Sequence, residues 1–168
     1  MLNGKLLMNI QLKRADYHDK KHSEDLISLL NAYAIDPMGG GEPLDDYVKE
    51  NLITSLKQRQ DVFSILCYVD NEAAGLLNCI EGFSTFSAKP VMNIHDVTVL
   101  PKFRGLGLSE KLFIEVEVLA KEKGCCKLTL EVLEGNEVAK NAYQKYGYSG
   151  YELDPKMGKA IFWQKKIT

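Results

Sequence analysis

The sequence has 168 residues, of which 45% are hydrophobic and 26% charged, and its formal net charge is −2. These values are ordinary for a soluble globular protein, and the length fits one domain spanning residues 1–168. A slightly negative chain does not indicate a nucleic-acid surface, and no run approaches the roughly 20 apolar residues of a membrane span, so we expect neither partner.

The cysteines and histidines do not indicate a metal site. Four cysteines lie at positions 67, 79, 125 and 126, and three histidines at 18, 22 and 95, with no zinc-site spacing. Cys67 and Cys79 lie in apolar, strand-like runs and are expected to be buried thiols. Because the N-terminus also lacks a secretion signal, we expect a reducing, cytoplasmic location.

The first third of the chain predicts one strand followed by two helices. Apolar residues alternate within residues 5–14, which indicates a strand, and recur on one helical face near residues 20–35. Residues 36–43 contain three consecutive glycines and end that helix. We interpret them as a flexible loop, or alternatively as a mobile wall of an acceptor site. A second helix follows over residues 44–56, where leucine or valine recurs every fourth residue.

The centre of the chain predicts a hairpin, a further strand and a long helix. Residues 61–70 and 73–83 are apolar runs separated by a tight polar turn, which is typical of a β-hairpin. Residues 92–100 are β-branched and alternating, and they form the next strand. After a glycine-containing turn, apolar residues recur at helical spacing up to Gly124, a common C-terminal cap. They are Leu108, Leu112, Val116, Leu119 and Ala120.

The last third predicts a strand, a short helix and two final strands. Residues 127–133 alternate cleanly and follow a crossover helix, so this strand should lie parallel to the one at 92–100. A helix is expected over 137–146, and strands over 148–153 and 160–166. The order β-α-α-β-β-β-α-β-α-β-β predicts an α/β (α+β) fold with a mixed sheet of about seven strands.

The turn between the strand at 92–100 and the long helix has the features of a phosphate cradle. The first turn of a helix carries backbone N–H groups without intrahelical partners and a partial positive charge. Gly105 and Gly107 let a bulky anion approach the backbone, and Arg104 adds a fixed positive charge. The alternative is an ordinary strand-helix turn with a glycine for packing. Neither the P-loop pattern nor the three-glycine dinucleotide pattern, which would need glycine at Glu110, is present.

Residues 104–109 fit the pattern Arg/Gln-x-x-Gly-x-Gly/Ala, with Ser109 at the last position. With the preceding Asp-Val-Thr-Val-Leu-Pro, this resembles the coenzyme A-binding motif of the GNAT superfamily of N-acetyltransferases. The resemblance implies acetyl-CoA as co-substrate, without a metal, in the gap between splayed strands at 92–100 and 127–133. The implied binding residues are Val97, Thr98, Val99, Arg104, Gly105, Leu106, Gly107, Leu108 and Ser109.

A second motif lies in the short helix near the C-terminus. Asn136 and Tyr143 are seven residues apart, about two helical turns, so they share nearly the same face. The stretch fits a pattern of asparagine, six residues, tyrosine, three residues, glycine and an aromatic residue, which ends here at Gly147-Tyr148. This pattern resembles the second cofactor motif of the same family. The resemblance implies that Asn136 binds the pantetheine chain and that Tyr143 is the general acid for the leaving thiolate. By themselves, Asn136 could be an ordinary helix N-cap and Tyr143 a core-edge aromatic.

Acetyl transfer to an amine also needs oxyanion donors and a base. If the strands splay apart, backbone N–H groups near Val97–Val99 would be available to the thioester oxygen. A primary amine, with a pKa of about 10.4, arrives protonated, so a base or a water chain must accept a proton. His95 is the leading candidate, since Ile-His-Asp resembles the acid-bearing stretch of polyamine and thialysine acetyltransferases. Asp96 could act instead or anchor a cationic acceptor, because a one-residue bulge would exchange the side chain that faces the cleft. Glu81 and Glu131 are weaker alternatives.

The resemblance therefore predicts an acetyl-CoA-dependent N-acetyltransferase acting on a small-molecule amine, such as a diamine or polyamine. An enzyme acting on protein lysines or N-termini, and a non-catalytic acyl-CoA sensor, are the alternatives. A homodimer is expected by analogy with many members of the superfamily. The aromatic residues Tyr148, Tyr151, Phe162 and Trp163 could serve an interface or the core.

Overall fold

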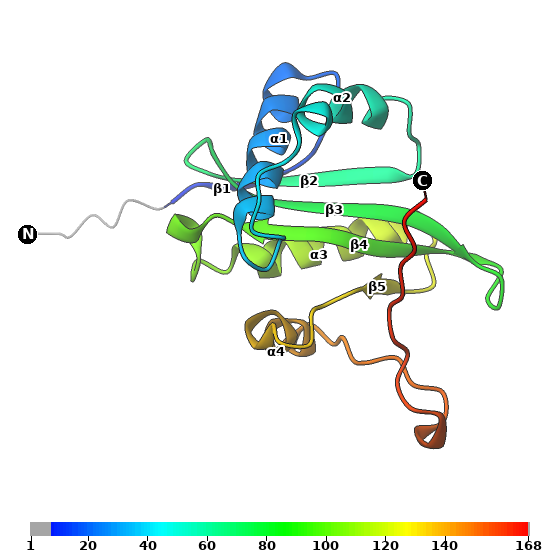
Figure 1. Cartoon of the computed structure of the whole chain (residues 1–168). Coiled ribbons are helices and arrows are strands. Elements are labelled where there is room, and N and C mark those ends of the chain that lie inside the picture. Colours follow the sequence, from blue (N-terminus) through cyan, green and yellow to red (C-terminus); the bar gives the residue numbers. More distant parts are fainter. Residues whose placement is uncertain (1–7, 168) are drawn as a thin grey trace, which may run out of the picture. The chain divides into compact units, whose positions relative to one another are not determined.

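The computed structural model describes residues 8–167, and in these residues a five-stranded sheet is the central element (Figure 1). The helices and strands, in chain order, are β1 (Ile10–Arg14), α1 (Lys20–Ile35), α2 (Asp46–Leu56), β2 (Val62–Val69), β3 (Glu72–Ser84), β4 (Lys89–Val99), α3 (Leu108–Glu122), β5 (Leu128–Leu130) and α4 (Glu137–Lys145). Residues 5–7 of the predicted first strand lie outside this range. The other elements up to α4 agree with the predicted types and order.

The chain divides into two compact units, one up to Leu130 and one from Glu131 onward. The first unit contains the whole sheet, with strand order β1-β2-β3-β4-β5. The first four strands pair antiparallel, whereas β4 and β5 pair parallel, as the crossover through α3 predicts. The mixed sheet and its parallel pair confirm the predicted fold class.

Helices cover both faces of this sheet. Figure 1 shows α1 and α2 on one face and α3 on the other. Leu26 and Leu29 of α1 pack in one buried cluster with Leu66 and Leu76 of the sheet, and α2 contributes Leu56. On the opposite face, the apolar stripe predicted for α3 is fully confirmed, because its five residues are all buried.

The buried thiols are a second confirmed expectation. Cys67 on β2 and Cys79 on β3 are both fully buried, and the Cys79 thiol donates to the Phe63 carbonyl oxygen at 3.6 Å. Burial raises the pKa of Cys79 to about 12, with a smaller contribution from Cys125. These two thiols therefore behave as small core side chains.

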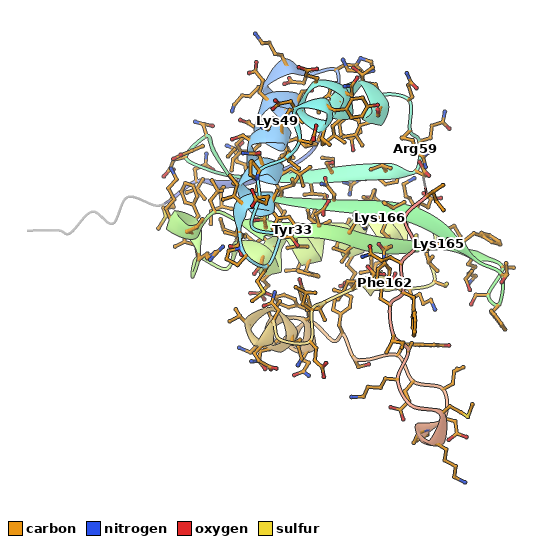
Figure 2. The ribbon with its side chains drawn as sticks, viewed as in Figure 1. Tyr33, Lys49, Arg59, Phe162, Lys165 and Lys166 are labelled. Carbon is orange, nitrogen blue, oxygen red and sulfur yellow. The ribbon has the colours of Figure 1, made fainter. Side chains whose placement is uncertain are left out.

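The second unit contains α4 and an extended C-terminal segment, and here two predicted strands are wrong. Residues 148–153 and 160–166 are not strands, and the pairing in this segment is an isolated bridge between Glu152 and Lys159, just before the second range. Alternation alone does not make a strand, because each strand needs a hydrogen-bonding neighbour along its length. The apolar side chains of this segment are consequently exposed, with Phe162 at 75% (Figure 2) and Trp163 at 80%.

Neither a membrane span nor a metal cluster is found in the described part of the chain. None of its helices has the length and apolar character needed to cross a membrane. Within residues 8–167, no group of three or more histidine, cysteine or acidic side chains is placed to hold a metal ion.

Candidate active site

Strands β4 and β5 pair over only three residues. Met92, Asn93 and Ile94 pair with Leu128, Thr129 and Leu130, and β4 then continues to Val99 without a further pair to β5. The predicted fifth strand, 127–133, is correspondingly shorter. On its other edge β4 stays paired with β3 through Val99. On the side of β5, the segment Val97–Val99 therefore has no strand partner.

The turn after β4 has the conformation that an anion site requires. Gly105 and Gly107 both have positive φ angles, 80° and 71°, in the left-handed region that favours glycine. A Cβ atom built on either glycine would meet no other atom within 4 Å, so open space lies over the backbone. Helix α3 begins at Leu108 without a side-chain cap. The bare helix N-terminus and the open backbone fit a diphosphate.

Arg104 is held in place on the same turn. Its Nε donates to the Val99 carbonyl oxygen at 3.1 Å, and its Nη2 donates to Asp36 Oδ2 at 3.1 Å. Asp36 is the residue directly after α1. The Met38 backbone N–H and then Arg104 hold the pKa of Asp36 below its ordinary value. Arg104 thus connects the end of β4 with the glycine loop that follows α1.

A bulge in β4 separates the two base candidates. Asn78 of β3 pairs with Asp96, and the next residue, Cys79, pairs with Ile94, so His95 is the extra residue. His95 is exposed, whereas Asp96 is half-buried on the α1 face of the sheet. From the sequence, a one-residue bulge was expected to determine whether His95 or Asp96 faces the cleft. The structure contains such a bulge.

Asp96 lies in a polar environment that sequence reasoning missed. Its Oδ2 accepts a hydrogen bond from Asn78 Nδ2 at 3.0 Å. Tyr33, near the C-terminal end of α1 (Figure 2), has its pKa raised first by burial and then by the charges of Asp96 and Asp36. The half-buried Tyr33 phenol and two carboxylates therefore interact near the α1 side of β4. The available signal was a polar residue, Asn78, within the apolar run of β3.

Asn136 and Tyr143 lie on α4, in the second unit. The Asn136 side-chain oxygen accepts from the Ala139 backbone N–H at 3.1 Å, so it caps the helix as its sequence position also suggested. Its amide nitrogen is not part of that cap. Tyr143 and Tyr148 face each other with ring centroids 6.3 Å apart at 59°. Residue types and helical spacing are thus as the second motif requires.

The alternative acid Glu81 has a structural role. It forms an ion pair with Lys123 at 2.8 Å, and the Lys123 ammonium lies 4.1 Å from the centre of the Phe63 ring. Cys79 and Glu81 lie on the α3 face, opposite Asp96, because they alternate with Asn78 along β3. Glu81 therefore stabilises the packing of α3 on the sheet.

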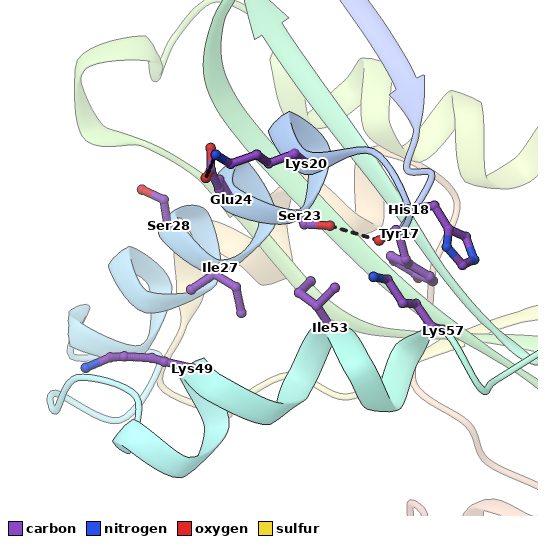
Figure 3. Close-up of a pocket in the computed structure, with 10 residues that line it drawn as sticks. All are labelled: Tyr17, His18, Lys20, Ser23, Glu24, Ile27, Ser28, Lys49, Ile53 and Lys57. Carbon is purple, nitrogen blue, oxygen red and sulfur yellow. Dashed lines mark hydrogen bonds and ion pairs between the residues drawn. The ribbon is translucent and has the colours of Figure 1, made fainter.

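A groove of about 570 Å³ lies between α1 and α2, apart from these residues (Figure 3). Ile27 and Ile53 form its apolar part, and lysines and hydroxyl groups surround it. Its lining comprises Tyr17, His18, Lys20, Ser23, Glu24, Ile27, Ser28, Lys49, Ile53 and Lys57. None of the predicted site residues is among them.

Comparison with known proteins supports the family resemblance. The acetyltransferase (GNAT) family model matches residues 25–148. The thialysine N-epsilon-acetyltransferase of Mus musculus is 35% identical over 39% of this chain and 38% of its own length, well under two thirds of that protein. The Caenorhabditis elegans thialysine N-epsilon-acetyltransferase is 26% identical over 76% of this chain and 77% of its own length.

A solved structure shows the same fold. An aminoglycoside N-acetyltransferase in complex with CoA superposes with a TM-score of 0.73, covering 95% of this chain and 97% of that one, at 20% identity. The family model covers well over half of the sequence. The chain therefore belongs to the acetyltransferase (GNAT) family.

Proposed function

We propose that this enzyme transfers the acetyl group of acetyl-CoA directly to a primary amine of a small cationic molecule, such as a diamine, a polyamine or an amino acid related to lysine. The single observation that carries the proposal is the arrangement at the end of β4. There, a strand segment without a pair on β5, two glycines with positive φ and a helix N-terminus without a side-chain cap follow one another from Val97 to Leu108.

The residues of the turn would hold the cofactor. Acetyl-CoA would supply an acyl group activated as a thioester. Arg104, Gly105, Leu106, Gly107, Leu108 and Ser109 would bind its diphosphate through backbone N–H groups and one guanidinium. Val97, Thr98 and Val99 would bind the pantetheine arm and donate to the thioester oxygen. Asn136 would bind the same arm from α4.

Three side chains would transfer the protons and bind the positive charge of the acceptor. Asp96 would anchor the ammonium group of the acceptor, and His95, exposed beside it, would accept the proton that the amine must lose. The amine nitrogen then bonds to the acyl carbon, and Tyr143 would donate a proton to the sulfur as the carbon–sulfur bond breaks.

A cationic acceptor is favoured by the charges around Asp96. The half-buried Tyr33 interacts electrostatically with both Asp96 and Asp36, and Arg104 forms an ion pair with Asp36. The relatives named above act on thialysine and aminoglycosides, both of which carry amines. A protein lysine or N-terminal amine is the second candidate, because the same carboxylate would anchor it.

The experiment is a coenzyme A release assay on a panel of amines. We expect turnover with small di- and polyamines or with lysine analogues, and a higher KM for the acceptor in Asp96→Asn. Turnover with peptides alone would favour the second candidate. Acetyl-CoA binding without turnover on any amine would indicate a sensor and contradict the proposal.

We further propose that residues 1–168 act as one catalytic domain, that the enzyme works in the cytoplasm, and that it forms a homodimer. The buried reduced thiols support the location, and the exposed apolar side chains at 161–163 support self-association. Light scattering coupled to size-exclusion chromatography tests the homodimer. We expect a mass twice that of the chain, and the monomer mass would contradict the dimer.

A further inference from the structure

Three polar side chains form a row across the sheet, directly beside the candidate site. Ser64 of β2 is opposite Asn78 of β3, and Asn78 is opposite Asp96 of β4. Cross-strand neighbours of this kind are close enough for their side chains to interact. The row lies on the face covered by α1, because Leu66 and Leu76, on the same face, pack against that helix.

The row continues as an unbroken chain of hydrogen bonds. Asn78 Nδ2 lies 3.0 Å from Asp96 Oδ2, and Ser64 Oγ lies 2.6 Å from Asn78 Oδ1. The hydroxyl of Tyr17, whose side chain borders the groove between α1 and α2 (Figure 3), lies 3.0 Å from Ser64 Oγ. Ser64 is only 2% exposed, so its bonds are shielded from water.

The direction of every bond follows from the first one. An ionised carboxylate only accepts, so Asn78 must present its NH₂ group to Asp96 and its carbonyl oxygen to Ser64. Ser64 uses its single proton in that bond, so in the 3.0 Å contact between the two hydroxyls Tyr17 is the donor. The Tyr17 hydroxyl also lies 3.4 Å from the Val62 carbonyl oxygen, a longer contact. Burial raises the pKa of Tyr17, which keeps this phenol protonated as a donor. All donors point toward Asp96.

We propose that Asn78 is a positioning residue, which Ser64 and Tyr17 orient so that it holds the Asp96 carboxylate in place as the anchor for the amine. This inference rests on the proposed function, because it assigns Asn78 a role only through Asp96. The bond occupies Asp96 Oδ2, so Oδ1 is the oxygen that would accept from the acceptor ammonium. The β4 bulge at His95 is what brings Asp96 into the row.

A double-mutant cycle tests this role. The variants are Asn78→Leu, which keeps a similar volume without hydrogen-bonding groups, Asp96→Asn, and the double variant. We expect Asn78→Leu to lower kcat/KM for the amine by roughly tenfold, mainly through KM, with the KM for acetyl-CoA unchanged. In the Asp96→Asn background the same substitution should change kcat/KM by less than about twofold.

The outcomes distinguish failure of the positioning role of Asn78 from failure of the proposed function. Equal losses in both backgrounds, or an equal rise in the KM for acetyl-CoA, would mean that Asn78 only supports the fold, and the inference would be wrong. No turnover by the unaltered enzyme with any amine would overturn the proposed function and this inference with it.

A second pair of variants covers the case in which Asn78→Leu does not fold. Ser64→Ala removes the hydroxyl that orients Asn78, and Ser64→Thr retains a hydroxyl at the same position. We expect Ser64→Ala to raise the KM for the amine and Ser64→Thr to restore it. The same KM in both variants would contradict the proposal.

Discussion

The guanidinium of Arg104 and the carboxylate of Asp36 form an ion pair at 3.1 Å, although they are 68 residues apart in the chain. Arg104 belongs to the turn that would bind a diphosphate, and Asp36 begins the glycine loop that follows α1. Gly39 of that loop lies so close to the Tyr33 carbonyl oxygen that a built Cβ would be 1.9 Å from it. The loop is therefore packed against the end of α1.

This arrangement predicts different effects for the two partners of the ion pair. Arg104→Ala should weaken acetyl-CoA binding by about tenfold, equivalent to about 1.4 kcal/mol, because it removes a charge from the turn. Asp36→Asn should have a smaller effect, because Arg104 Nε keeps its bond to the Val99 carbonyl oxygen. Calorimetric titration measures both, and a larger effect of Asp36→Asn would mean that the loop, not the guanidinium, controls the cofactor site.

Tyr143→Phe should lower kcat without a large change in the KM for acetyl-CoA. The substitution removes only the proton donor, and the ring contact with Tyr148 is retained. The loss should be smaller for an acyl donor with a more acidic thiol, since that leaving group needs less protonation. If the rate is unchanged at every pH, water protonates the thiolate instead.

The cysteines should differ in reactivity. Cys126 is exposed, whereas Cys67 and Cys79 are fully buried with raised pKa values. Iodoacetamide at neutral pH should therefore modify Cys126 in the folded protein and reach Cys67 and Cys79 only after unfolding. Mass spectrometry of the digested protein identifies the modified positions. Early modification of Cys79 would show that β3 opens locally.

Stability should fall at alkaline pH. The pKa values of Cys79, Tyr17 and Tyr68 are all raised in the folded state, chiefly by burial. In the unfolded chain these groups ionise at their ordinary pKa values, so their contribution to stability is complete below about pH 8.5 and is lost as the pH rises through the folded values. Urea midpoints measured from pH 7 to 11 should decrease, and Cys79→Ala should show a shallower decrease. A flat profile would contradict the burial of these groups.

Local patterns in the sequence were sufficient for most of the fold. The spacing of Leu108, Leu112 and Val116 predicts the buried face of α3, and the alternation within 92–100 predicts the central strand. The same alternation within 148–153 was misleading, because a strand depends on a neighbour that the local sequence does not specify. Helices, which satisfy their own backbone hydrogen bonds, do not have this dependence.

The candidate site was only partly predictable, because part of it is made of contacts between distant residues. The glycine turn is a local motif and was found. The ion pair of Arg104 with Asp36 depends on where the end of α1 lies beside the turn after β4. The row from Ser64 to Asp96 depends on sheet register. That register includes a bulge, which no pattern in the sequence specifies.

The most direct test of the account is calorimetric titration of acetyl-CoA into two glycine variants. Gly107→Ala and Gly124→Ala each place a Cβ at nearly the same φ, 71° and 69°, with no atom within 4 Å. Both substitutions therefore destabilise the backbone to the same extent, by about 1 kcal/mol. However, only Gly107 lies on the turn between β4 and α3, whereas Gly124 follows the end of α3. We predict at least about tenfold weaker binding for Gly107→Ala and unaltered binding for Gly124→Ala. Equal affinities in the two variants would contradict a cofactor site at this turn.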